Sequence, residues 1–165
     1  MQEKETFNPA RFADFSRCPS RGRILGLDLG TKRVGIAVCD ELQKIVRGEK
    51  TIERTSWKKF LKQTNELIAD FDAVALVIGL PLESDGSESE MSQEVRRVAR
   101  NFSLSLDIPV FLQDERLSSF EAKGRLWKLG FDNKKVFEQV DSEAAAIILS
   151  DFLDAKQNRE TDEVT

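Results

Sequence analysis

The sequence predicts a single α/β domain built on a mixed five-stranded sheet flanked by helices. Short apolar runs of strand length recur along the chain, and amphipathic helical patterns separate the later runs. Three strand-like runs come first, and helix and strand then alternate, which is typical of antiparallel strands joined to an α/β unit. A chain of 165 residues is long enough for one domain with a sizeable core.

Five segments have the character of strands. Residues 23–29 and 34–40 flank a short turn at 30–33 and are expected to pair as an antiparallel hairpin, followed by a weaker strand at 45–52. The run AVALVIG at 73–79 is apolar throughout, as in a strand buried on both faces. A last short strand is expected at residues 109–112.

Four helices are expected between and after these strands. Hydroxyl side chains suited to capping begin the first three, at Thr55 or Ser56, at Ser87 or Ser89, and at Ser118 or Ser119. These helices end near Ala69, Ser103 and Gly130. The last helix is predicted to begin near Asp141, because an aspartate side chain also caps helices well.

The two ends of the chain differ from its middle. Residues 1–20 and 157–165 are polar without a sustained period, so they are expected to be a flexible leader and a polar tail around a domain at 21–156. The sequence shows no signal-peptide pattern and no apolar run of membrane-spanning length, which places the chain in the cytoplasm. Cys18 and Cys39 form no CxxC pair and are expected to be reduced thiols.

Composition restricts the chemistry available to this chain. Histidine is absent, which excludes Ser-His and Cys-His catalysis, histidine-zinc sites and histidine general bases. The net charge is −4, so the chain is not a general electrostatic binder of nucleic acid, although bound divalent cations would reverse the sign locally. Hydrolytic chemistry would have to use carboxylates, lysine, a thiol or a metal ion.

Asp28 is an acid within the apolar first strand of RILGLDLGTKRVGIAV. An unpaired carboxylate in such a strand costs several kcal/mol or stays protonated. Backbone donors of the turn at 30–33, a cationic side chain or a metal ion would each compensate it. The residues alone leave these readings open.

Four motifs connect the chain to a known family. The motifs are LDLGTKRVGIAV (27–38), VIGLPLESDGSES (77–89), LQDERLSS (112–119) and VDSEAAAIIL (140–149). In this order and spacing they resemble the YqgF/RuvX family, whose members have an RNase H-like fold and are described as pre-16S rRNA nucleases or, earlier, as Holliday junction resolvases. The resemblance spans residues 23–155, and the leader departs from it, since members usually begin a few residues before the first strand.

The resemblance implies that Asp28, Glu115 and Asp141 are catalytic and bind Mg²⁺ or Mn²⁺. Carboxylate oxygens are ligands that Mg²⁺ prefers, and two ions roughly 3.5–4 Å apart can activate a water and neutralise a leaving oxygen. Several alternatives stay open. Asp114 could be the ligand in place of Glu115, Glu115 could be a surface acid paired with Arg116, and Asp141 could be only a helix cap.

Thr31, Lys32 and Arg116 are the expected substrate-binding residues. The Gly30 and Thr31 amides could form a small anion nest, and the arginine fork matches phosphate. A solvated hairpin turn and a structural salt bridge are the alternatives for Lys32 and Arg116.

The leading functional hypothesis is a metal-dependent nuclease acting on structured RNA, with pre-16S rRNA processing implied by the resemblance alone. The alternatives are a Holliday junction resolvase on branched DNA and a non-catalytic ribosome-assembly factor. A nucleotide-binding protein of the sugar kinase, Hsp70 and actin type is a further alternative, but the chain lacks the second DxGT-type turn of that class. A monomer or a homodimer is expected.

Overall fold

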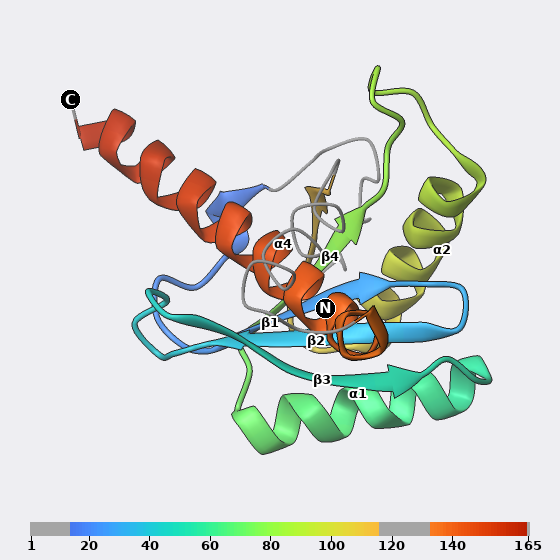
Figure 1. Ribbon diagram of the computed structural model, residues 1–165. Helices are drawn as coiled ribbons and strands as arrows, with labels where there is room; N and C mark the ends of the chain where they lie inside the picture. The colour runs from blue at the N-terminus through green and yellow to red at the C-terminus, as the bar shows by residue number, and fades with distance from the viewer. Residues whose placement is uncertain (1–13, 116–132, 165) are drawn as a thin grey trace.

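Five strands form one mixed sheet in the computed structural model, which describes residues 14–115 and 133–164, without the side chains of 133–141 and 163–164 (Figure 1). The sheet order is β3-β2-β1-β4-β5. β2 pairs antiparallel with β1 and β3, whereas β4 pairs parallel with β1 and β5, so the predicted mixed sheet is confirmed. The strands are β1 (Ile24–Leu29), β2 (Arg33–Cys39), β3 (Val46–Glu53), β4 (Ala75–Leu80) and β5 (Val110–Asp114).

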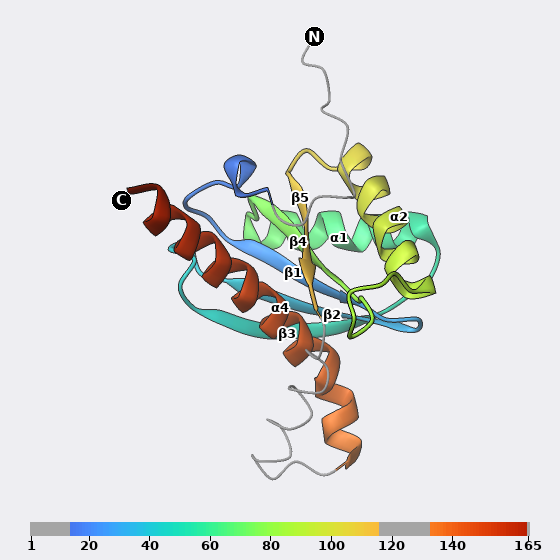
Figure 2. The ribbon, with the colours of Figure 1, turned by 90° about the horizontal axis from the view of Figure 1, so that it is seen from above.

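Helices cover both faces of this sheet. The α-helices α1 (Trp57–Phe71) and α2 (Glu90–Ser105) pack on one face, and α4 (Asn133–Val164) crosses the other (Figure 2). As predicted, a serine caps each of the first two: Ser56 accepts a hydrogen bond from the Lys59 amide, and Ser89 forms a capping box.

Alternation along β1 divides its side chains between the two faces. Leu25, Leu27 and Leu29 belong to the core cluster under α1 and α2, whereas Ile24 belongs to the cluster under α4. Because strand side chains alternate, Asp28 lies in the row that faces α4.

Glycines let α4 lie very close to the sheet. A Cβ atom on Gly26 in β1 would stand 3.0 Å from the Leu149 Cβ, and one on Gly48 in β3 would stand 3.0 Å from the Ser142 carbonyl oxygen. Side chains at these two positions would push the helix away, so glycine here sets the spacing between α4 and the strands.

The predicted start of the last helix is wrong. α4 runs from Asn133 to Val164, so Asp141 lies inside the helix and is not its N-cap. The residues before it, NKKVFEQV, include several good helix formers, and their propensity extends the helix past the local capping signal. The helix predicted from Ser118 or Ser119 to Gly130 lies outside the described residues.

Part of the predicted leader has defined structure. A short 3₁₀ helix, η1 (Phe15–Arg17), places the Phe15 ring 5.2 Å from the Phe152 ring of α4. The Gln43 side-chain amide donates to the Pro19 carbonyl at 3.0 Å. Cys18 and Cys39 are free thiols. No helix in the described ranges is both long enough and apolar enough to cross a membrane.

Candidate active site

Asp28 lies half-buried near the carboxyl end of the central strand β1. Its antiparallel partner in β2 is Gly35, which has no side chain to cover it. On the other side, Leu27 pairs with Ile78 of β4, so Asp28 and Gly79 are the next residues of two adjacent parallel strands. The carboxyl end of a parallel strand is where open α/β sheets place ligands.

Glu115 follows β5 directly and reaches back over β4. Its amide donates to the Leu80 carbonyl at 3.1 Å, which extends the β4–β5 ladder by one residue. A Cβ atom on Gly79 would stand 2.7 Å from the Glu115 Oε2. The carboxylate therefore lies against Gly79, on the strand that adjoins β1 and on the same face of the sheet as Asp28.

The structure separates Glu115 from its sequence neighbour. Asp114 pairs with Leu80 and alternates with Val110 and Leu112, which pack in the cluster under α1 and α2. Strand alternation thus directs Asp114 to the face opposite α4. Of the two acids that the sequence left open, Glu115 is the one that shares a face with Asp28.

The third predicted acid is placed only by its backbone. Asp141 lies in α4 one helical turn before Ala145, and the Ala145 carbonyl oxygen would be 3.2 Å from a Cβ atom on Gly26. Its side chain lies outside the described part, as does Arg116. Among the described residues there is no group of three potential metal ligands. Asp28 and Glu115 offer oxygen donors on one face, which fits a hard divalent cation.

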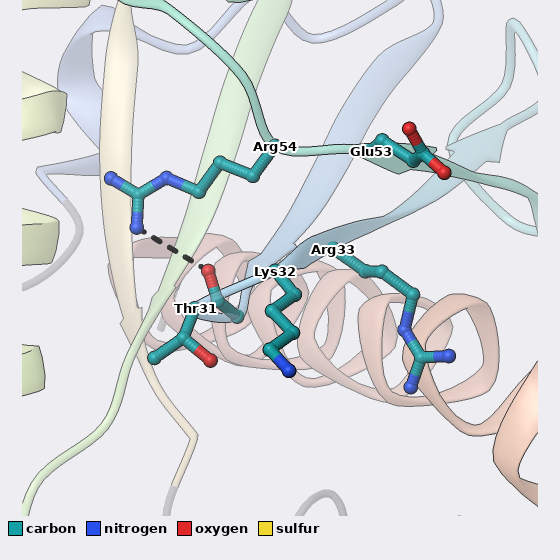
Figure 3. Close-up of a pocket in the computed structure, with 6 residues that line it drawn as sticks. Thr31, Lys32, Arg33, Glu53 and Arg54 are labelled. Atoms are coloured by element: carbon teal, nitrogen blue, oxygen red, sulfur yellow. Dashed lines mark hydrogen bonds between the residues drawn. The ribbon is translucent and has the colours of Figure 1, made fainter.

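The turn after Asp28 borders an open cavity of about 660 Å³, lined by Gly30, Thr31, Lys32, Arg33, Glu53 and Arg54 (Figure 3). Thr31 and Lys32 are exposed, and Lys32 forms no ion pair with any residue that the structure describes. The Gly30 amide donates to the Arg33 carbonyl at 2.8 Å. This amide is therefore engaged in the turn, which removes it from the anion nest expected from the sequence.

Arg54 is a site residue that sequence reasoning missed. Its guanidinium donates to the Gly30 carbonyl at 3.3 Å and forms an ion pair with Glu94 in α2. Arg97 binds the same carboxylate, and hydrogen bonds from Arg97 and then Arg54 lower the pKa of Glu94 to about 2. An arginine just after a surface strand has no local signal of such a role, because its partner lies 40 residues further along the chain.

The sheet order, the covering helices and the acids at the carboxyl edge define an RNase H-like fold. T. thermophilus RuvC in complex with a Holliday junction substrate has a similar structure, with a TM-score of 0.52 and 14% identity over 83% of this chain and 96% of that chain. At an identity this low, the comparison shows a likeness of fold alone.

The chain belongs to the RuvX family. The family model described as "RuvX: Holliday junction resolvase" matches residues 22–155. A relative from Anaeromyxobacter sp. (strain K) is 41% identical over 134 residues, which cover 81% of this chain and 98% of the relative. A relative from Rhodopseudomonas palustris (strain BisB5) is 40% identical over 136 residues, which cover 82% of this chain and 85% of the relative. Both relatives are named "Putative pre-16S rRNA nuclease".

Proposed function

We propose that this protein is a divalent-metal-dependent nuclease that hydrolyses phosphodiester bonds in structured RNA, with the precursor of 16S rRNA as its substrate. The placement of Asp28 and Glu115 on one face, around Gly79, is the structural observation that supports it most. The substrate is taken from the names of the relatives that are about 40% identical. A precursor of ribosomal RNA is found in the cytoplasm, so this is the proposed place of action.

Asp28, Glu115 and Asp141 are the proposed ligands of Mg²⁺ or Mn²⁺. When bound, such ions supply an activated water and stabilise the charge that develops on the leaving oxygen. Asp141 precedes Ala145 by one helical turn, and Ala145 packs on the sheet beside β1, which supports including Asp141 in this set. A third carboxylate there would complete the oxygen donors that Asp28 and Glu115 begin.

Lys32, Thr31 and Arg116 are the proposed contacts to substrate phosphate. Lys32 is exposed beside the cavity and follows Asp28 by four residues. Its ammonium group has no carboxylate partner among the described residues. A phosphate bound at Lys32 would lie near the acids, because the tight turn keeps the two positions close. α4 packs on the same face of the sheet as the two acids, so the proposed site lies beside this helix.

Asp28→Asn tests the proposal directly. The purified protein is incubated with precursor 16S rRNA and Mg²⁺ or Mn²⁺, and the cleavage rate is measured. We expect the wild type to cleave and the variant to be slower by about a hundredfold or more, because a lost metal ligand removes several kcal/mol of transition-state stabilisation. Asp70→Asn, on the exposed side of α1, is the matched control and should keep the wild-type rate. Unchanged cleavage by Asp28→Asn would remove Asp28 from the site.

A junction resolvase is the second candidate, favoured by the description of the family and by the RuvC fold. Four-way DNA junctions belong in the same assay beside the rRNA precursor. Faster cleavage of junctions than of rRNA would assign the protein to this activity. Resolvases act on two-fold symmetric substrates, so a strictly monomeric protein in sedimentation would count against it.

A further inference from the structure

Arg54 binds the turn that follows Asp28 from two directions. Its main-chain amide donates to the Lys32 carbonyl at 2.8 Å. Its guanidinium donates to the Gly30 carbonyl at 3.3 Å, the bond that Figure 3 marks with a dashed line. The side chain is only 19% exposed. One residue at the end of β3 therefore fixes the path of the turn on both sides of Thr31.

The same guanidinium connects this turn to α2. It forms an ion pair with Glu94, and Arg97 binds that carboxylate through two N–H groups, at 3.0 Å and 2.7 Å. Hydrogen bonds to an ionised partner are stronger than neutral ones, and a forked guanidinium adds geometric precision. The turn, the end of β3 and the middle of α2 are thus joined through one charged cluster, Arg54–Glu94–Arg97.

The charge balance of this cluster makes Arg54 less suited than Lys32 to bind phosphate. The Glu94 carboxylate compensates the Arg54 charge, and two of the Arg54 nitrogens already donate to a carboxylate and a carbonyl. Lys32 is exposed and has no such partner in the described part of the chain. Figure 3 shows Lys32 and Arg33 extending from the turn away from the Arg54 guanidinium.

We infer that Arg54 is a positioning residue, which acts through the turn and does not contact substrate. The turn begins two residues after Asp28 and contains Lys32, so its path sets the distance between the proposed metal ligand and the proposed phosphate contact. Displacing reacting groups by about 1 Å can cost a hundredfold in rate. This inference rests on the proposed nuclease function.

Three variants of the full chain and one control test the inference. Arg54→Gln should lower kcat by about ten- to a hundredfold and leave KM for precursor rRNA nearly unchanged, since positioning and not binding is lost. Arg54→Lys should recover part of kcat, because an ammonium group can keep one of the two contacts but not both. Glu94→Gln should lower kcat in the same direction as Arg54→Gln and likewise leave KM nearly unchanged.

Arg47→Gln is the matched control. Arg47 lies in β3 near the end opposite to Arg54, is exposed, and pairs with Glu49 at 3.4 Å. This variant should match the wild type in kcat and KM. A raised KM with unchanged kcat in Arg54→Gln would overturn the inference, because it would make Arg54 a substrate contact.

Hydrogen exchange gives a readout that does not depend on activity. The Gly30 amide, bonded to the Arg33 carbonyl, should exchange faster in Arg54→Gln and in Glu94→Gln than in the wild type and in Arg47→Gln. The amides of β4 serve as internal reference for global stability. Unchanged protection at Gly30 in Arg54→Gln would overturn the inference. Failure of the wild type to cleave rRNA, with faster exchange in the variants, would instead refute the proposed function alone.

Discussion

Gly79 leaves the space that the Glu115 carboxylate occupies. A Cβ atom there would stand 2.7 Å from the Glu115 Oε2 and 2.5 Å from the Ile148 Cδ1, so the ends of both side chains would have to move. The glycine thus serves the candidate site and the packing of α4 at once. Its role is visible only from the two neighbours that reach it from β5 and α4.

Gly79→Ala is expected to reduce both activity and stability. Overpacking of this kind costs about 1–3 kcal/mol of unfolding free energy, and relief requires both Ile148 and Glu115 to move. Denaturant unfolding and the rRNA cleavage assay measure the two effects. Gly26→Ala is the comparison, since its Cβ would meet Leu149 at 3.0 Å without contacting Glu115. We expect Gly26→Ala to lose a similar amount of stability but less of the cleavage rate. Cleavage by Gly79→Ala at the wild-type rate would contradict the placement of Glu115.

Adjacent acids at the end of β5 should differ sharply in importance. Glu115 lies against Gly79 on the α4 face, whereas Asp114 alternates with Leu112 on the opposite face. Glu115→Gln should therefore lower the cleavage rate by about a hundredfold, as expected for a metal ligand, and Asp114→Asn should keep most of it. Cleavage rates of the two variants at saturating Mg²⁺ or Mn²⁺ measure this difference. The reverse ranking would return Asp114 to the ligand set.

Local patterns predicted most elements, and they failed where longer-range packing decides. Alternation, buried apolar runs and serine caps located the strands and the first two helices to within a few residues. The predicted start of α4 was wrong because the helix formers that precede Asp141 outweigh the preference of aspartate for a capping position. The contact between Arg54 and Glu94 had no local signal, since it exists only when the end of β3 lies beside α2.

The contact between β3 and α2 should depend on pH. Hydrogen bonds from Arg97 and Arg54 lower the pKa of Glu94 from 4.5 to about 2. A depressed carboxyl pKa stabilises the fold fully above 4.5, and this contribution is lost as pH falls from 4.5 towards 2. The partly exposed pair is worth on the order of 1 kcal/mol. The difference in unfolding free energy between wild type and Glu94→Gln should therefore be largest near neutral pH and shrink below 4.5. A difference that grows in acid would contradict the ion pair.

At the scale of the molecule, the sheet brings together residues that are remote in the chain. Asp28 and Glu115 are 87 residues apart, but β4 lies between β1 and β5, and its Gly79 separates the two acids by a single strand. The sequence indicated the acids through family motifs, and only the parallel register explains why they share a face. The chain has a net charge of −4, and the exposed basic turn Gly30–Arg33 follows the strand that carries Asp28.

This charge distribution predicts that RNA binding depends on divalent cations. An acidic protein repels a polyanion unless bound cations reverse the local sign, so affinity for precursor rRNA should drop strongly when EDTA replaces Mg²⁺. With Mg²⁺ present, few phosphates are neutralised, and Lys32→Gln should reduce the salt slope of log K by about one. Lys62→Gln, exposed on α1, should leave the slope unchanged. Tight binding that persists in EDTA would show that the protein holds RNA through a surface other than the acids and the turn Gly30–Arg33.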